Sequence, residues 1–463
     1  MSIQFDPINL HASMTGAKHG LDPAEVQAAQ PKALAALEGF HKSFDEGRYG
    51  FPALPAQGRL LKQISAAAAS LAGSYDTVCV AGIGGSALGA WALDCALRGP
   101  HPVQAAHSIR NPRLVILDNV DPEFIELALA SMNPARTLVV PIAKSGATAE
   151  TMATFLIVDE WMKQALGARK AAARTIAVTS QGRGDLKAFA TANNLATFHI
   201  PESVGGRFSV LSPVGLVPAA LAGLDIKAVC RGAASMTRQS WTADLAGNVA
   251  LRSALYHYLI WTLRKKTIQV AFPYSNRLWG LAFWFRQLWA ESLGKAKDRK
   301  GKTVNIGQTP IAALGATDQH SQAQLYMEGP NDKVFSFWAV NRWSTQGAIP
   351  KARTGLDSFD YLAGQSLAKL IDAERNATAA ALTAAGRPNC TFALDRVDAA
   401  HVGAFMQLLE FQTAFMGELL GIDAFDQPGV ELGKVFTFGL MDRPGYSTYA
   451  ENFRAYEQRR KGQ

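Results

Sequence analysis

The segment TVCVAGIGGS, residues 77–86, decides the fold. Residues 77–81 form a continuous apolar run, and a run without polar alternation is typical of a parallel strand that is buried on both faces. The glycines that follow permit a tight turn, and a stretch rich in Ala and Leu begins after Ser86. The segment therefore predicts a strand, a turn and a helix, which is the repeating unit of α/β domains.

The same alternation of strand and helix recurs in two series. A helical stretch, from about residue 211 to residue 248, separates them. Another helical stretch is predicted at 362–420. Further buried strands are predicted at 113–117, 137–142 and 175–179 in the first series, and at 267–271, 309–314 and 333–340 in the second.

Two tandem, doubly wound α/β domains with parallel sheets and helical N- and C-terminal arms explain this pattern better than one large sheet. The length of 463 residues also suits more than one domain. We expect an N-terminal arm with entry helices at 1–70, a first domain at 71–225, a second domain at 226–440 and a C-terminal tail at 441–463.

The composition, with 48% hydrophobic and 18% charged residues, excludes a disordered or fibrous chain. A net charge of +8 favours anionic ligands, phosphate among them, without selecting one class. The basic clusters are short, and no zinc finger, heptad or aromatic RNA-binding motif accompanies them. We therefore expect them to be solvated surface, with no nucleic-acid partner. The clusters lie at 264–266, 295–302 and 459–461.

The cysteines and the N-terminus indicate the compartment. Residues 1–10 include Asp6 and Pro7, where a signal peptide needs a basic start and an apolar core. The most apolar stretch, 208–224, contains two prolines and is shorter than the ~20 residues of a membrane span. We expect a cytoplasmic protein without a membrane partner. The cysteines form no CxxC pair and are too sparse for a disulfide framework: Cys79, Cys95, Cys230 and Cys390.

The glycine turn at 82–86 predicts an anion site, because the helix behind it directs free N–H groups and the positive end of its dipole at the turn. A dinucleotide site, and with it an oxidoreductase, is an alternative, since Gly82, Gly84 and Ala87 satisfy the G-x-G-x-x-G/A spacing. Such a site needs an acidic residue about 20 positions further on, and the first candidate is the more distant Asp118.

A second loop, AKSGATAET at 143–151, also lies at a strand end and opens a helix. Its hydroxyl residues around Gly146 can surround a terminal phosphate, and Lys144 adds charge. An ordinary helix cap made by Ser145 or Thr148 is the alternative, but it explains one hydroxyl and not three. The P-loop spacing is absent, so a sugar phosphate is favoured over ATP.

A candidate acid–base set follows. Arg207, in the segment 204–212, is a fixed cation suited to stabilising negative charge on a substrate oxygen. An amphipathic helix is predicted at 278–293, and it carries Gln287 and Glu291 four residues apart, hence on one face. Glu291 is the candidate general base.

Three further polar residues complete the set. His320 lies in a polar, turn-rich stretch just beyond a predicted strand and could shuttle protons. Gln427 and Lys434 are seven residues apart, at a two-turn helical spacing if Pro428 begins a helix. No HxH or HExxH motif occurs, so the sequence offers no set of metal ligands.

Taken together, these stretches resemble the phosphoglucose isomerase family, whose members are glucose-6-phosphate isomerases, from about residue 77 to residue 434. Six motifs occur in the family's order, which chance does not explain. They are GIGGS at 82–86, KSGATAET at 144–151, GGRFSVLSPVG at 205–215, QLWAES at 287–292, DQHS at 318–321 and GVELGK at 429–434.

The resemblance implies two sugar isomerase (SIS) domains and a reversible aldose–ketose isomerisation of glucose 6-phosphate and fructose 6-phosphate without a cofactor or metal. It implies that Glu291 moves a proton between C1 and C2 through a cis-enediol, with Arg207 stabilising the enediolate. It also implies that His320 and Lys434 open the ring, and that Gln287 and Gln427 hold the sugar phosphate. The implied phosphate site comprises Ser86, Lys144, Ser145 and Thr148 with the loop amides, Gly85 and Gly146 among them.

In this family the counterpart of His320 comes from the neighbouring subunit, so the resemblance implies a homodimer with a shared active site. One departure is Ala143, where many members have Ser, which removes one donor from the phosphate loop. A non-catalytic SIS-type sensor of sugar phosphates is the alternative function. A sensor would need the phosphate loops but not Glu291, His320 and Lys434 together.

Overall fold

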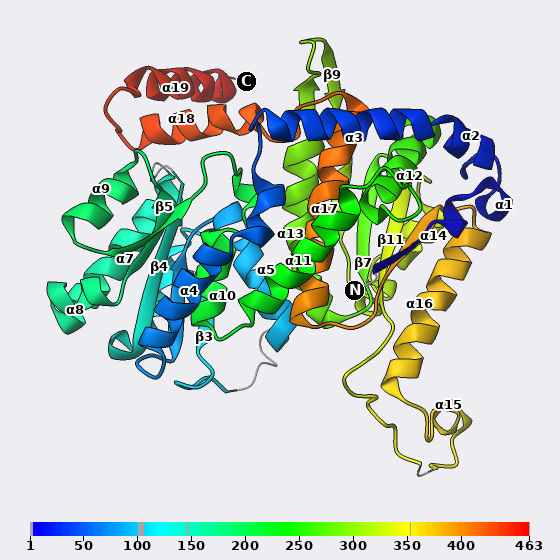
Figure 1. Ribbon diagram of the computed structural model, residues 1–463, viewed down its shortest axis with the longest axis horizontal. Coiled ribbons are helices and arrows are strands. Elements are labelled where there is room, and N and C mark those ends of the chain that lie inside the picture. The colour runs from blue at the N-terminus through cyan, green and yellow to red at the C-terminus, as the bar shows by residue number, and fades with distance from the viewer. Residues whose placement is uncertain (1–2, 101–105, 145, 147, 352, 463) are drawn as a thin grey trace.

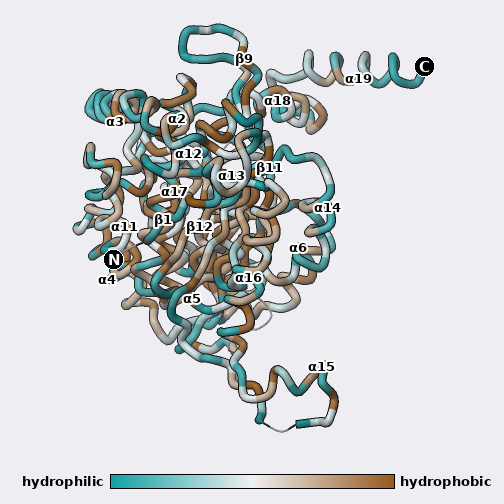
Figure 2. The backbone as a smooth tube through the Cα atoms, turned by 90° about the vertical axis from the view of Figure 1, so that its right-hand side faces the viewer, coloured by the Kyte–Doolittle hydropathy of each residue, from teal (hydrophilic) through white to brown (hydrophobic). Residues whose placement is uncertain are grey.

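The computed structural model describes residues 3–100, 106–144, 146, 148–351 and 353–462. Two sheets of five strands lie side by side with helices between and around them, which confirms the α/β fold class (Figure 1). Hydrophobic residues gather in the interior, whereas the helix α15 (Asp357–Asp360) and the C-terminal helix α19 (Ser447–Lys461) project from the body (Figure 2).

The first sheet is parallel throughout, in the order β3-β2-β4-β5-β6. The three strands at its centre are buried along their whole length, as their unbroken apolar runs predict. The sequence does not reveal β6, an edge strand whose polar residues and partial exposure hide the apolar signal. The strands are β2 (Thr77–Ala81), β3 (Arg113–Leu117), β4 (Thr137–Ala143), β5 (Ile176–Ser180) and β6 (Ala196–Ile200).

The second sheet has the order β1-β12-β11-β7-β10. Its four core strands are parallel, and β1 adds an antiparallel edge in which Ile3 pairs with Leu394. The expectation of continuous helix over 362–420 is wrong, because β12 interrupts it with a short buried strand between two long helices. The strands are β1 (Ile3–Asp6), β7 (Ile268–Pro273), β10 (Thr309–Ala312), β11 (Lys333–Val340) and β12 (Asn389–Leu394), and β8 (Lys295–Lys297) and β9 (Thr303–Ile306) form a separate hairpin.

The N-terminal segment is integrated with the rest of the chain. Besides β1 in the second sheet, helix α3 (Gln30–Asp45) contacts α17 (Ala399–Leu420), and α4 (Gly58–Leu71) contacts α10 (Pro213–Leu221). At the other end of the chain, α18 (Glu431–Leu440) and α19 pack against each other above the first sheet (Figure 1). The domain boundaries at residues 70, 225 and 440 stay a prediction.

The remaining α-helices cover the two sheets (Figure 1). They are α1 (Ala12–Thr15), α2 (Pro23–Ala28), α5 (Leu88–Arg98), α6 (Pro122–Ala130), α7 (Ala149–Leu166), α8 (Ala168–Ala173), α9 (Asp185–Ala192), α11 (Ile226–Ser240), α12 (Val249–Arg264), α13 (Asn276–Leu293), α14 (Ala323–Glu328) and α16 (Leu367–Ala384).

Helices α5 and α13 join the two halves of the molecule. They pack so closely that a Cβ built on Gly280 would lie 2.8 Å from the Cβ of Cys95. The end of α5 meets the start of α13, where the Nε of Arg277 donates to the carbonyl oxygen of Ala96 at 2.6 Å. The two helices are therefore antiparallel, and because each follows a strand of its own sheet, the carboxyl edges of the two sheets point in opposite directions.

Glu410 in α17 is an ionisable group inside this core. Its residue is fully buried, and neither carboxylate oxygen has a hydrogen-bond partner among the described residues. The side-chain amide of Gln407, one turn earlier, is buried without such a partner as well. Burial raises the pKa of Glu410 well above its ordinary value, because the charged form is poorly solvated there.

We predict that Glu410→Gln stabilises the protein at pH 8 by about 1 kcal/mol and leaves its stability at pH 4 unchanged. As the pH rises, the carboxyl ionises in the unfolded chain first, so the parent protein loses stability above the ordinary pKa of Glu until the folded pKa is passed. Urea denaturation at both pH values measures the effect, with the exposed Glu38→Gln as control. Equal stabilisation at both pH values would show that ionisation of Glu410 is not the cause.

Candidate active site

The glycine turn after β2 and the loop that carries Arg207 meet backbone to backbone. A Cβ built on Gly85 would lie 2.3 Å from the carbonyl carbon and oxygen of Gly206, so this position admits no side chain without displacing the loop. On the neighbouring residue, Gly84, a Cβ would lie 2.9 Å from the Nε2 of Gln287. The turn, the Arg207 loop and the last turns of α13 therefore form one group of contacts.

Arg207 is buried, with 2% of its surface exposed. Its Nε donates to the hydroxyl of Ser292 at 2.7 Å, and its Nη1 donates to the Oε1 of Gln427, also at 2.7 Å. Its Nη2 donates to the carbonyl oxygens of Ala424 and Asp426 at 2.5 and 3.0 Å. These bonds hold the guanidinium in one orientation and compensate for its removal from water.

The Arg207 guanidinium faces Glu291, the candidate base, with 3.6 Å between Nη1 and the carboxylate Oε2. Burial lowers the pKa of Arg207, and the nearby charge of Glu291 opposes that shift. The Nε2 of Gln287 donates to the other carboxylate oxygen of Glu291 at 3.0 Å. A third of the Glu291 side chain is exposed, so a ligand can contact the carboxylate, whereas its neighbour Arg207 is buried and held in place.

Lys295 ties the end of α13 to the segment that Arg207 binds. Its Nζ donates to the carbonyl oxygen of Glu291 at 3.0 Å and pairs with the carboxylate of Asp426 at 2.8 Å. The expectation that the basic clusters are solvated surface is wrong for Lys295, which is 8% exposed, and for the fully buried Lys266. The Nζ of Lys266 donates to the Oδ1 of Asn331 at 2.7 Å, a distant partner that the local sequence does not reveal.

The second loop that the sequence predicts to bind phosphate follows β4, which lies next to β2 in the sheet. Since β3 lies on the other side of β2, the loops after β2 and β4 flank the point where the strand order reverses, the usual ligand site of open α/β sheets. Gly146 has a φ of +72°, and a Cβ there would lie 2.3 Å from the backbone nitrogen of Leu186. The loop therefore requires glycine at this position.

The side chains of this loop differ in what they contact. Thr148 precedes α7, yet its side chain makes no capping hydrogen bond, so the helix-cap alternative fails for this residue. The Nζ of Lys144 donates to the carbonyl oxygens of Glu202 and Val204 at 2.6 and 3.1 Å, which links the loop to the segment before Arg207. Ser145 lies outside the described residues.

His320 is not part of this group. It is exposed in the segment after β10, where the neighbouring Gln319 accepts a hydrogen bond from the hydroxyl of Tyr274 at 2.9 Å. Tyr274 comes just before α13, whereas Glu291 lies at the far end of that helix. At 1.5 Å per residue the 15 steps from Asn276 to Glu291 span about 22 Å, so one chain keeps His320 away from its own Glu291.

Lys434 also stands apart from the Arg207 contacts in the described structure. It lies on α18, half exposed, and its Nζ pairs with the Oε1 of Glu431 at 2.7 Å. Pro428 begins a short 3-10 helix and α18 itself starts at Glu431, close to the helical start that the sequence predicts. Gln427, in contrast, contacts Arg207 directly.

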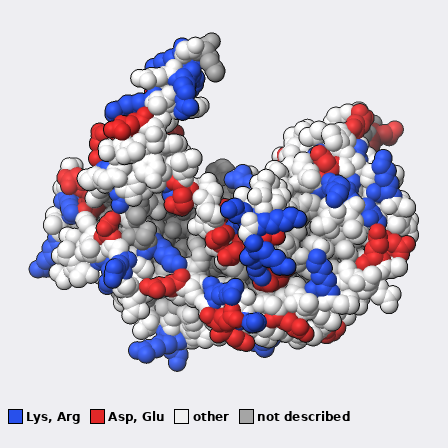
Figure 3. All heavy atoms as spheres, turned by 90° about the horizontal axis from the view of Figure 1, so that it is seen from above, with Lys and Arg blue, Asp and Glu red and all other residues white. Residues whose placement is uncertain are grey.

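Seen from above, the molecular surface is hollowed between two lobes, and basic and acidic side chains are interspersed over it (Figure 3). Within the described ranges, no group of three or more His, Cys, Asp or Glu side chains could hold a metal ion. None of the helices over the same residues combines the length and apolarity that a membrane crossing needs.

We predict that Gly85→Ala lowers the free energy of unfolding by about 1–3 kcal/mol, because the new methyl group must push the Arg207 loop away. Gly205→Ala is the matched control, since its Cβ would meet only the carbonyl oxygen of Phe425 at 3.8 Å. Chemical denaturation of both variants measures the difference. Equal stability of the two would contradict the close contact of the loops.

Comparison with known proteins places these contacts in a family. Residues 65–457 match the phosphoglucose isomerase family. Two curated relatives are named glucose-6-phosphate isomerase. The one from Rubrobacter xylanophilus is 46% identical over 81% of this chain and 84% of its own, and the one from Carboxydothermus hydrogenoformans is 40% identical over 93% and 92%.

Solved structures agree with this result. A hypothetical protein from Thermus thermophilus superposes with a TM-score of 0.85 and 36% identity, over 95% of this chain and 100% of that one. A glucose-6-phosphate isomerase from Chlamydia trachomatis shares the fold, with a TM-score of 0.77 and 23% identity over 95% and 91% of the two chains. The chain therefore belongs to the phosphoglucose isomerase family.

Proposed function

We propose that this protein interconverts glucose 6-phosphate and fructose 6-phosphate, a reversible aldose–ketose isomerisation, at the site around Glu291. The observation that carries the proposal is the arrangement of an accessible carboxylate 3.6 Å from a buried, fully oriented guanidinium. A base that exchanges protons needs access to substrate, and the oxyanion formed by its action needs a fixed cation nearby. The names of the curated relatives support the same reaction.

The phosphate group of the substrate would bind between the loops after β2 and β4. The Lys144 ammonium would contribute the one N–H group that does not bond to the carbonyl oxygens of Glu202 and Val204. The other proposed phosphate ligands are the backbone amides of Gly85 and Gly146 and the hydroxyls of Ser86, Ser145 and Thr148. Both loops open helices, α5 and α7, whose N-termini favour an anion. Gln287 and Gln427, which hydrogen-bond to Glu291 and Arg207 respectively, would orient the sugar from the opposite side.

In the proposed reaction, Glu291 removes the proton from C2 of the open-chain aldose. The electron pair forms the double bond of a cis-enediol, and the carbonyl oxygen at C1 gains the negative charge that Arg207 stabilises. A proton then passes from the hydroxyl at C2 to the negatively charged oxygen at C1. Glu291 returns a proton to C1, the oxygen at C2 becomes the carbonyl oxygen, and the ketose results. No atom is lost or gained, and the chemistry needs no cofactor, which stays a prediction of the sequence.

Ring opening is assigned to His320 and Lys434, and we propose that His320 acts in the active site of a second subunit. The length of α13 supports this arrangement, since His320 and Glu291 of one chain lie at its two ends. A two-fold dimer exchanges equivalent surfaces, so each subunit could supply His320 to the other. The proposal therefore includes a homodimer with a shared active site, located in the cytoplasm.

The sensor alternative finds no support in the names of the relatives, which are those of enzymes. A sensor would also have no use for a general base held beside Arg207. The dinucleotide alternative rests only on the spacing of Gly82, Gly84 and Ala87, and the names of the relatives do not support it either.

We predict that the purified protein, with metals chelated, interconverts the two hexose phosphates, and that Glu291→Gln lowers turnover by about two to four orders of magnitude. The amide can still accept the hydrogen bond from Gln287, so sugar-phosphate binding is retained. Glu126→Gln, on the exposed side of α6, is the control for loss of one carboxylate. Unchanged turnover in Glu291→Gln would remove this residue from its role.

The shared site predicts complementation between inactive variants. When Glu291→Gln and His320→Ala chains are unfolded together and refolded, half the dimers are mixed, and each has one intact site. Roughly a quarter of the wild-type activity should return. Each variant refolded alone is the control, and a mixture no more active than these controls would contradict the exchange of His320 between subunits.

A further inference from the structure

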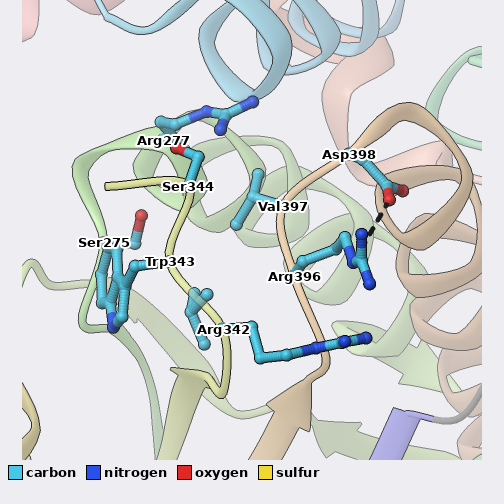
Figure 4. A pocket seen from close by; sticks show the side chains of 9 residues that line it. Ser275, Arg277, Arg342, Trp343, Ser344, Arg396, Val397 and Asp398 are labelled. Atoms are coloured by element: carbon cyan, nitrogen blue, oxygen red, sulfur yellow. Dashed lines mark ion pairs between the residues drawn. The ribbon is translucent and has the colours of Figure 1, made fainter. Parts of the chain in front are cut away.

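The second sheet has its own point of strand reversal, between β7 and β11, since β10 lies on the other side of β7. A cavity of about 430 Å³ opens there, lined by residues that follow β7, β11 and β12 (Figure 4). It occupies the place in the second sheet that corresponds to the phosphate loops of the first. Open α/β sheets bind their ligands at this place, at the carboxyl ends of the strands.

This cavity is separate from the candidate active site. Ser275, in its wall, immediately precedes α13, and Glu291 lies in the last turn of the same helix. The length of α13 separates the two by about 24 Å. A ligand in the cavity would therefore leave the active site free.

Ser275 is a buried residue whose hydroxyl the fold leaves unused. The residue is 5% exposed and lies on the cavity wall beside Trp343 (Figure 4). It occupies the N-cap position of α13, where a serine normally bonds to the first turn, yet its side chain makes no capping bond. Its hydroxyl has no hydrogen-bond partner among the described residues, and the start of an 18-residue helix behind it favours an anion.

Arg277, in the first turn of α13, adds a fixed positive charge. Its Nε donates to the carbonyl oxygen of Ala96 at 2.6 Å, and its Nη2 lies 3.5 Å from the carbonyl oxygen of Leu97. No carboxylate of the described residues forms an ion pair with it by direct contact. Its remaining Nη1 is available to a ligand on the cavity side.

The rim of the cavity carries two more arginines, which share two carboxylates. Arg342 binds Asp395, with its Nε 2.7 Å from Oδ1. Arg396 is held more loosely, at 3.4 Å from Asp395 and 3.9 Å from Asp398 (Figure 4). Both arginine side chains are about half exposed or more, at 61% and 48%. Together with Arg277, the guanidinium groups exceed the carboxylates by one positive charge.

We propose that this cavity is a second, non-catalytic binding site for a small phosphorylated metabolite, with the phosphate at Ser275 and Arg277 and the rim closed by Arg396. The volume exceeds that of a phosphate ion and lies in the usual range for a small organic ligand. The hydroxyl of Ser344 and the ring of Trp343 line the remaining space and suit the hydroxyls and carbons of a polyol.

Glycerol 3-phosphate is the probe, because it carries a phosphate and hydroxyls but no carbonyl, and so cannot be isomerised. Equilibrium dialysis on the full-length protein should find two sites per chain, one at the phosphate loops and one in this cavity. In Ser275→Ala/Arg396→Met the second site should weaken at least roughly tenfold while isomerase turnover is unchanged. Arg169→Met, on the exposed helix α8, controls for the loss of one positive charge.

A single site in the parent protein that the double variant leaves unchanged, or two sites of unchanged affinity in the double variant, would overturn the proposal. Thermal denaturation of the double variant without ligand shows whether its fold is intact. If the fold is not intact, the affinity of the second site is measured in the single variant Arg396→Met, which is altered only on the rim. Failure of the isomerase proposal can be told apart from failure of this one. If the parent protein shows no turnover, the proposed function fails, but binding of glycerol 3-phosphate in the cavity can still be measured.

Discussion

The buried guanidinium of Arg207 joins segments that lie 85 and 220 residues away along the chain. A buried cation is costly unless its donors are satisfied, and here Ser292, Gln427 and two backbone carbonyls satisfy them. The last turn of α13, the loop after Gly205 and the segment before α18 must therefore all adopt their native positions together. The geometry of the candidate active site depends on this one group, because it also faces Glu291.

The two groups that face each other in the site differ in freedom. Arg207 is fixed on all sides, whereas Glu291 is partly exposed and held only by Gln287 and by the position of its helix. Lys295 secures that position through the carbonyl of Glu291. This difference suits their proposed roles, since an oxyanion is best stabilised by a preorganised cation, and a base that transfers a proton between two carbons must reach both.

The opposite directions of the two sheets have a further consequence. The helix α13 leads from the carboxyl edge of the second sheet to the candidate active site beside the first, so the residues after β7 and β10 lie far from Glu291. His320 and the arginine-lined cavity both belong to that distant edge. Within one chain, Glu291 and His320 therefore lie near opposite ends of α13. We propose that a second subunit brings its His320 to the Glu291 of the first.

The sequence predicts those parts of the fold that carry a local signal. The central strands are recognisable because burial on both faces leaves them without polar alternation and without charged residues, and α13 because its apolar positions recur with the helical period. Strand β1 is not recognisable, since it is a short edge strand whose partner, β12, lies near the other end of the chain. Strand β12 is missed as well, although it also pairs with β11.

The burial of Lys295 and Lys266 has no local signal either, because a lysine is buried only when distant carbonyls or carboxylates receive its charge. The site residues Arg207, Gln287, Glu291 and Gln427 are brought together in the structure. Their roles, with those of Ser86, Lys144, Ser145 and Thr148 in phosphate binding, stay a prediction.

The most direct test of the account is the fate of the proton at C2. Glucose 6-phosphate is incubated with the enzyme in deuterated water, and deuterium at C1 of the fructose 6-phosphate and at C2 of the recovered aldose is followed by NMR. Transfer by Glu291 through a cis-enediol predicts deuterium at both carbons, because a carboxyl group exchanges its proton with solvent. Conversion without any deuterium in either sugar would contradict the account.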